Sequence, residues 1–133
     1  MIELETTSVD QYGAYSFSDL NPGTYYISLK SCTKKWGGSN SIDAYMIMQY
    51  FLGNTYGGLP EVASDVWDLG SINTTDAFAV QQRFVHLIDY FESGDWVTDF
   101  FGGSNQVVIT NSNVTHDVYT ICFGDVNRSF IPY

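Results

Sequence analysis

Hydrophobic and polar residues alternate along the first part of the chain, which is the pattern of half-buried β-strands. Residues 15–18 and 25–29 both alternate in this way. Residues 19–23 lie between them and read Asp-Leu-Asn-Pro-Gly, in which proline and glycine favour a turn. A second turn is predicted at residues 10–13. The sequence therefore predicts a meander of short strands over residues 2–29.

The hydrophobic spacing becomes helical in the middle of the chain. One helix is predicted over residues 41–52, where a glycine ends it, and a second from residue 74 to residue 90 or 91. Alternation then returns at 107–110 and 118–123. The simplest arrangement is one β-sandwich with a helical pair inserted in it or packed on its end.

The two predicted helices begin with the same short motif. Residues 40–45 read Asn-Ser-Ile-Asp-Ala-Tyr, and residues 73–78 read Asn-Thr-Thr-Asp-Ala-Phe. The Asn of each motif is expected to cap its helix, and the Asp three residues later suits the positive helix end. Two copies are too few for a solenoid, so we infer a duplicated loop-and-helix unit.

The motif also places oxygen atoms where an EF-type calcium loop has its last ligands. Counting Asp76 as the twelfth loop residue makes Asn73 the ninth and Asp65 the first. Trp67 and Leu69 then take the third and fifth positions, and neither offers a side-chain oxygen. The loop before the second helix is therefore an incomplete calcium site.

The first copy of the motif lacks the early ligands of such a loop. It has the late oxygens, from Asn40 and Asp43, whereas the C-terminal segment has the early ones, from Asp125, Asn127 and Ser129. We hypothesise that these five residues form one calcium site in space, within one chain or between neighbouring chains. The alternative is that the C-terminal segment is simply a solvated polar tail.

Composition narrows the classes of partner. Fifteen Asp and Glu residues face five Lys and Arg, which gives a formal net charge of −10. Nucleic-acid binding is not expected, because phosphate contacts need clustered basic side chains. No apolar run is long enough to cross a membrane, so no membrane insertion is predicted. Low charge with many aromatics suits either a secreted β-rich protein partly covered by neighbours or an ordinary tyrosine-rich sandwich.

The chain has two cysteines, Cys32 and Cys122, each at the end of an alternating run. A disulfide between them would tie an early strand to the last one. Two buried free thiols are the alternative, and spacing alone does not decide between them.

The repeated Asn-x-x-Asp-Ala motif before an apolar helix resembles dockerin modules. The order of segments 36–44, 82–85, 94–96 and 124–129 is most similar to divergent dockerin-like regions of large surface proteins of Bacteroidetes-type bacteria. Residues 13–25 are similar to carboxypeptidase-regulatory-like and Cna-B-like sandwiches. The resemblance implies an extracellular or cell-surface location, a calcium-stabilised helical pair and a role in protein–protein assembly.

Such sandwiches normally have another strand before the one that residues 2–4 would form. The missing strand would leave an open edge that another chain could fill by strand addition. Partners are therefore expected to be other protein chains, including copies of this one. Fibre assembly is one form that this association could take.

Rival functions are supported less well. The two His residues have no partner at zinc-ligand spacing, and no nucleophile motif or phosphate-binding loop is present, so an enzyme is not expected. Carbohydrate binding through exposed Trp36, Trp67 and Trp96, or docking to a cohesin, remain the alternatives. An exposed row of these tryptophans would favour sugar binding, and their burial would exclude it.

The sequence thus predicts an α+β fold. An Ig-like or transthyretin-like antiparallel β-sandwich would comprise residues 1–35 and 97–133. A dockerin-like helical pair at residues 36–96 would be inserted in it. The expected function is that of a non-enzymatic extracellular assembly module with structural calcium.

Overall fold

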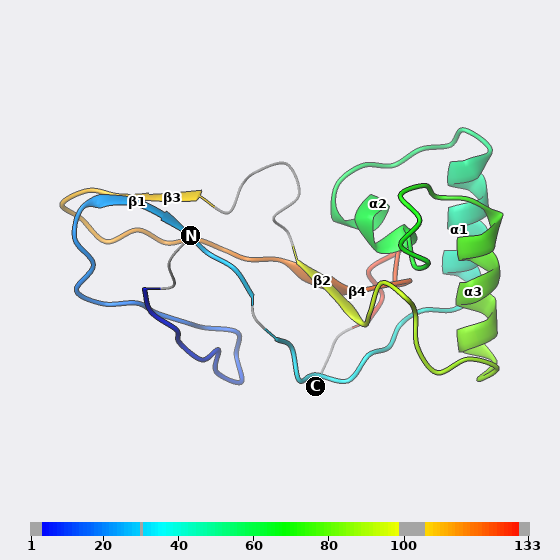
Figure 1. The fold of residues 1–133 in the computed structure, drawn as a ribbon, viewed down its shortest axis with the longest axis horizontal. Helices are drawn as coiled ribbons and strands as arrows, with labels where there is room; N and C mark the ends of the chain where they lie inside the picture. The colour runs from blue at the N-terminus through cyan, green and yellow to red at the C-terminus, as the bar shows by residue number, and fades with distance from the viewer. Residues whose placement is uncertain (1–3, 30, 99–105, 131–133) are drawn as a thin grey trace. The chain divides into compact units, whose positions relative to one another are not determined.

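The computed structural model describes residues 4–29, 31–98 and 106–130. Within these ranges it is a mixed α and β protein with three helices and two antiparallel sheets of two strands each (Figure 1). No helix among the described residues is long and apolar enough to cross a membrane. In chain order the elements are β1 (Gly23–Tyr26), α1 (Ser41–Phe51), α2 (Leu59–Ser64), α3 (Thr74–Phe84), β2 (Trp96–Thr98), β3 (Gln106–Ile109) and β4 (Thr120–Cys122).

The chain divides into two compact units. Unit 1 comprises Met1–Ile27 and Gln106–His116, and unit 2 comprises Ser28–Asn105 and Asp117–Tyr133. The predicted division assigned the last part of the chain to a sandwich together with the N-terminal strands. In the structure, β2, β4 and the C-terminal segment belong to the same compact unit as the helices.

Unit 1 contains one two-stranded sheet. β1 and β3 pair antiparallel, with Tyr25 opposite Val107 and Thr24 opposite Val108. Val107 is the one buried residue among those described in this unit, whereas Val108 is 56% exposed. The predicted turn at 10–13 is present, and the Asp10 carboxylate accepts the backbone N–H groups of Tyr12 and Ala14 across it. A sheet this small with one buried apolar residue has almost no core of its own.

The sequence did not predict which of the later strands pair. In the structure, β3 pairs with β1 and β4 pairs with β2. Residues 15–18 form no strand, although their tyrosine and phenylalanine are half-buried and their serines exposed, as alternation predicts. Alternation reports which face is buried but not which strand is the neighbour. A β-sandwich is not seen among the described residues, and the strand expected to begin at residue 2 lies largely outside them.

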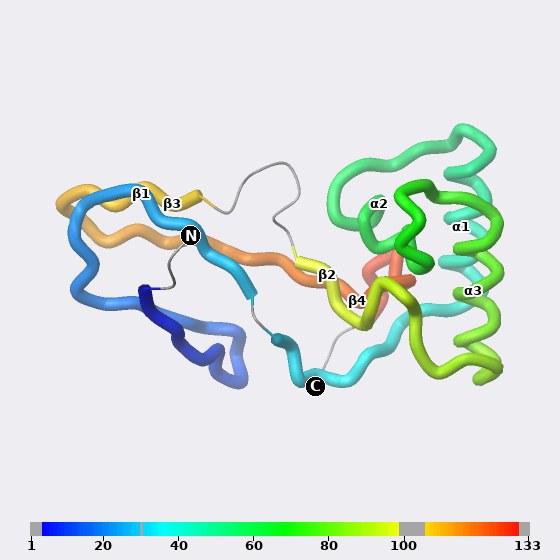
Figure 2. The backbone as a smooth tube through the Cα atoms, viewed as in Figure 1, coloured from blue at the N-terminus to red at the C-terminus, as the bar shows by residue number. Residues whose placement is uncertain are grey.

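The core of unit 2 is built on α1 and α3. These helices lie side by side and run in opposite directions (Figure 2). Small residues at their contact, Ala44 and Ala77, are 0% and 2% exposed, which lets the helices approach closely. The core also takes in one valine from the segment after α2 and one from the C-terminal segment. Its buried members are Ala44, Ile47, Val66, Ala77, Ala79, Val80, Phe91 and Val126.

Both long helices begin where the sequence predicts, but α3 ends early. It stops at Phe84 rather than at residue 90 or 91, because His86 adopts the left-handed region with φ 61°. The N–H of Leu87 then donates to the carbonyl of Gln82 at 2.8 Å. This closure satisfies a terminal carbonyl and turns the chain away from the helix axis.

The short helix α2 has no counterpart in the prediction. Its glycine and proline, at 58 and 60, suggest a turn when they are considered in sequence alone. In the structure Gly58 is the N-cap and Pro60 lies in the first turn, where its fixed φ suits a helix start. Its Ala63 is fully buried.

Candidate metal centre

The C-terminal segment lies against the start of α1. Asp43, in the first turn of α1, is fully buried. One of its carboxylate oxygens accepts the N–H of Asn40 at 2.9 Å, and the other accepts the N–H of Asn127 at 3.0 Å. The two partial motifs recognised in the sequence therefore meet within one chain.

The C-terminal segment curls around a second buried carboxylate. Asp125 is 1% exposed, and its Oδ1 accepts both the N–H and the hydroxyl of Ser129, at 3.0 and 3.2 Å. Its Oδ2 accepts the N–H of Phe130 at 3.1 Å. Arg128 supplies the sharp bend with a φ of 58°. These bonds make residues 125–130 a defined loop rather than a loose tail.

The same loop is built a second time after α2. The Asp65 carboxylate accepts the N–H groups of Leu69 and Gly70, at 3.1 and 2.9 Å. Asp68 has a φ of 55° at the position that Arg128 holds in the other loop. Residues 65–70 thus reproduce the carboxylate-centred bend of residues 125–130.

Each loop also contacts a helix in the same way. The N–H of Trp67 donates to Asp76 at 3.1 Å, just as Asn127 donates to Asp43. Asp76 is fully buried in the first turn of α3. Unit 2 therefore contains two equivalent loop-and-helix sites, one of which uses residues that are distant in sequence.

Burial makes the negative charges of Asp43 and Asp76 costly. It raises the pKa of Asp43 above its ordinary value, against the backbone N–H donors of Asn127 and Asn40, and the negative Asp125 raises it further. Burial likewise raises the pKa of Asp76, and Asp65 adds to the effect. No Lys or Arg pairs with Asp43 or Asp125 among the described residues. A cation beside either pair of carboxylates would offset both the burial of their charge and their mutual repulsion.

The two sites differ in the oxygen atoms they offer. Beside Asp43 and Asp125, the first site has the amide of Asn127 and the hydroxyl of Ser129. In the second site Trp67 and Leu69 occupy the corresponding loop positions and offer no side-chain oxygen. Calcium takes roughly six to eight oxygen ligands, and the first site offers a larger part of such a set than the second.

Clusters of acidic, His or Cys side chains do not by themselves mark the site. No group of three or more such residues is arranged to hold a metal in the part of the chain that the structure describes. Amide, hydroxyl and backbone oxygens are also calcium ligands, so this finding does not bear on a site with two carboxylates.

The asparagines of the repeat are helix caps, as predicted. The side-chain oxygen of Asn40 accepts the N–H of Ile42, and that of Asn73 accepts the N–H of Thr75, both at 2.8 Å. The Asp of each motif completes a capping box. Direct binding of metal by these two amide oxygens would compete with the caps.

Glycines make room for the C-terminal loop, a role that the sequence alone does not predict. A Cβ on Gly38 would lie 2.4 Å from the Cβ of Phe130 and 2.8 Å from the Cγ of Asp125. A Cβ on Gly124 would lie 2.7 Å from the Ser39 hydroxyl. One usable signal was present in the sequence, because an Asp-Val pair opens both loops, at residues 65 and 125.

The sequence left a disulfide between the two cysteines open, and in the structure both are free thiols. Cys122 is buried in β4, where its sulfur accepts the N–H of Gly37 at 3.4 Å. Burial raises the pKa of its thiol to about 11. Cys32 is half-buried. Cys122 therefore serves as a packed core residue, which was the alternative interpretation.

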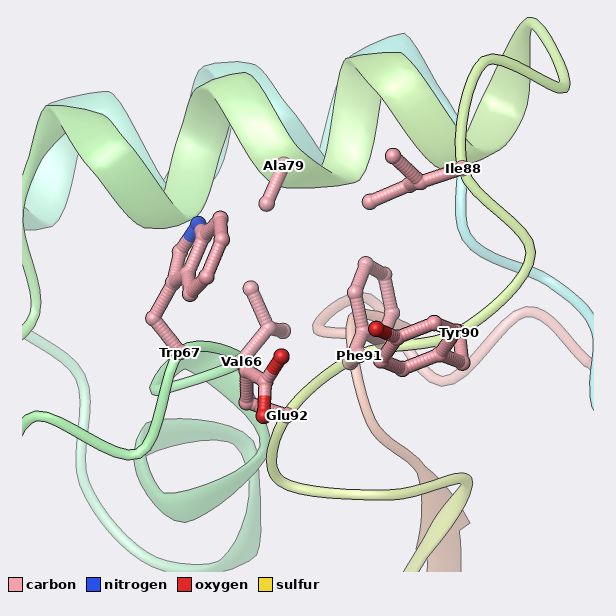
Figure 3. Close-up of a pocket in the computed structure, with 7 residues that line it drawn as sticks. All are labelled: Val66, Trp67, Ala79, Ile88, Tyr90, Phe91 and Glu92. Atoms are coloured by element: carbon pink, nitrogen blue, oxygen red, sulfur yellow. The ribbon is translucent and has the colours of Figure 1, made fainter.

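The three tryptophans form no exposed row, and all are half-buried. The indole N–H groups of Trp36 and Trp96 donate to the backbone carbonyls of Phe123 and Lys34. Trp67 lines a small, mainly apolar pocket of about 90 Å³ with Ala79 and other residues (Figure 3). No observation therefore favours a flat sugar-binding platform.

A buried arginine joins several parts of unit 2. Arg83, 7% exposed, stacks on the ring of Trp36 at 3.5 Å and lies 4.6 Å from the ring of Phe91. Its guanidinium also pairs with Asp95 at 2.8 Å. These contacts hold the segment before α1 against α3. The same segment contains Gly38, which packs on the C-terminal loop.

Comparison with known proteins adds no assignment. No family model matches the chain, and neither a curated protein nor a solved structure matches it.

Proposed function

We propose that the chain is a non-enzymatic, extracellular structural module that binds one calcium ion and associates with other protein chains. The observation that carries the proposal is the meeting of Asp43 with the 125–130 loop. Two buried carboxylates lie near each other there, and no described Lys or Arg pairs with either; the same loop carries an amide and a hydroxyl oxygen. The resemblance to dockerin modules supports the same assignment.

Calcium, when bound, would supply the positive charge that this site lacks. The carboxylates of Asp43 and Asp125 and the oxygens of Asn127 and Ser129 would hold it. Backbone hydrogen bonds to Asp43, Asp125 and Asn127 already fix the loop that carries these oxygens. Because the ion binds the folded chain alone, it would stabilise the fold by mass action.

Unit 1 is the basis for the assembly part of the proposal. It buries one apolar residue among those described, and its two four-residue strands have outer edges. We propose that it is part of an Ig-like or transthyretin-like sandwich that is completed by strand addition. A strand from another chain would supply both backbone partners and a core.

The calcium proposal is tested by thermal unfolding with calcium and with a chelator. Asp43→Asn and Asp76→Asn form a matched pair, since both residues are fully buried at the start of a helix and accept two backbone N–H groups. Both variants should lose stability through their altered hydrogen bonds. Only Asp43→Asn should also lose the calcium-dependent rise in melting temperature.

Two results would overturn the calcium proposal. One is a wild-type melting temperature that does not change with calcium. The other is an equal calcium response in Asp43→Asn and in the wild type.

A further inference from the structure

The helix pair presents an apolar surface to solvent. Its members are Tyr45, Met48 and Leu52, from α1 and its C-cap, and Phe78 and Val85, from α3 and its C-cap; we call these five residues the α1–α3 face. Their exposed fractions are 62, 42, 69, 59 and 57%. Large apolar side chains of this exposure, gathered on one helix pair, indicate an interaction surface.

The face follows from helical spacing. Residues 48 and 52 follow residue 45 by three and seven positions, which places all three along one side of α1. Ile47, which is fully buried, lies on the opposite side. Phe78 and Val85 occupy the same positions in the second copy of the repeat. Because α1 and α3 lie side by side, the two stripes belong to one helix pair (Figures 1 and 2).

No charged side chain interrupts the face. The charged residues of α1 and α3 are Asp43, Asp76 and Arg83, which are 0, 0 and 7% exposed. The chain as a whole has a net charge of −10. The exposed acidic residues therefore lie outside α1 and α3, so two copies that meet through this face bring no acidic side chains of these helices together.

The size of the face suits a dimer. A buried aromatic side chain covers about 150–250 Å². Two aromatic and three aliphatic residues, each about half exposed, thus present on the order of 500 Å². A standard interface buries about 800 Å² on each partner, so the face would be its apolar centre within a polar rim.

We infer that the α1–α3 face binds the same face of a second copy of this chain. Self-association is favoured because a neutral apolar face is complementary to itself, and a two-fold contact uses the same patch on both subunits. A basic partner would gain nothing from a surface without acidic side chains. This inference names one partner for the association proposed above, through unit 2 rather than through the strand edges of unit 1.

Sedimentation analysis of the purified full chain over a range of concentrations tests this dimer. Tyr45→Glu should weaken dimerisation roughly tenfold or more, because it buries a charge at the centre of the interface. Phe78→Glu should have the same effect. Tyr90→Glu is the matched control, since Tyr90 is 65% exposed but lies outside the face. Added salt should strengthen the wild-type dimer by screening the net charge.

A wild-type chain that stays monomeric at its highest soluble concentration would overturn the inference. So would a dimer that Tyr45→Glu and Phe78→Glu leave intact, or one that Tyr90→Glu weakens equally. Melting curves of the same samples, with and without calcium, confirm that each variant folds. A monomer with an intact calcium response would refute the dimer and leave the calcium proposal standing.

Discussion

The backbone N–H of Asn127 donates to the carboxylate of Asp43 at 3.0 Å, although the two residues are 84 positions apart in the sequence. The same bond joins Trp67 to Asp76 within one continuous loop. The C-terminal segment therefore takes the place, at α1, of a loop that at α3 immediately precedes the helix. The carboxylate at the start of α1 has both of its backbone N–H donors only when the C-terminal segment packs against the helix.

Glycine at position 38 should be required for this closure. Its φ of 85° and the approach of Phe130 and Asp125 leave no space for a Cβ. Gly38→Ala should lose about 1–3 kcal/mol more than Gly53→Ala, measured by urea unfolding. Gly53 is the control because its φ is 104° and nothing lies within 4 Å of its Cβ position, so its substitution causes backbone strain alone. Equal losses would show that the C-terminal loop does not pack on Gly38.

Arg83 should stabilise unit 2 mainly through stacking rather than through its charge. Arg83→Ala removes the contacts with Trp36 and Phe91 and should cost about 2–4 kcal/mol in urea unfolding. Arg83→Met retains an unbranched apolar chain between the rings and also removes a buried nitrogen that has no hydrogen-bond partner. It should cost about half as much or less. Equal costs would assign the stability to the ion pair with Asp95.

The cysteines should react at different rates. The thiol of Cys122 is buried and its pKa is raised to about 11, so little thiolate exists at neutral pH. A thiol reagent should therefore modify one cysteine in the folded protein and two in denaturant. Cys32→Ser should remove the fast reaction, whereas Cys122→Ser should retain it. A folded protein that releases two thiols only after reduction would instead contain the disulfide.

Asp76 should make the calcium-free protein less stable as the pH rises. Its folded-state pKa lies above the ordinary value of 3.8, so the native state keeps the proton to a higher pH than the unfolded chain does. The stability gained from this proton is fully present below about pH 3.8 and is lost as the pH rises through the raised pKa. In chelator, the free energy of unfolding of the wild type minus that of Asp76→Asn should therefore fall over this window. A difference that stays constant or rises would contradict the assigned shift.

The sequence was a good guide to the starts of α1 and α3 because local chemistry determines them. Asn40 and Asn73 each cap a helix, and the Asp three residues later completes the box. The early end of α3 was not predictable in the same way. It depends on His86 entering a backbone region that few residues other than glycine adopt.

The strands and the candidate site depended on contacts that are distant in sequence. Alternation at residues 107–110 predicted a strand but not its pairing with residues 23–26. The meeting of Asp43 with the C-terminal segment was inferred from two incomplete motifs. The role of the glycines that permit it was not predicted, because close approach of another segment leaves no local signal.

Calcium titration by calorimetry counts the ions that the site binds. We expect one calcium ion per chain for the wild type and for Asp65→Asn, and none for Asp125→Asn. Asp65 is the control because its carboxylate also accepts two backbone N–H groups in an equivalent loop. No binding by the wild type, or retained binding by Asp125→Asn, would contradict a calcium site between α1 and the C-terminal loop.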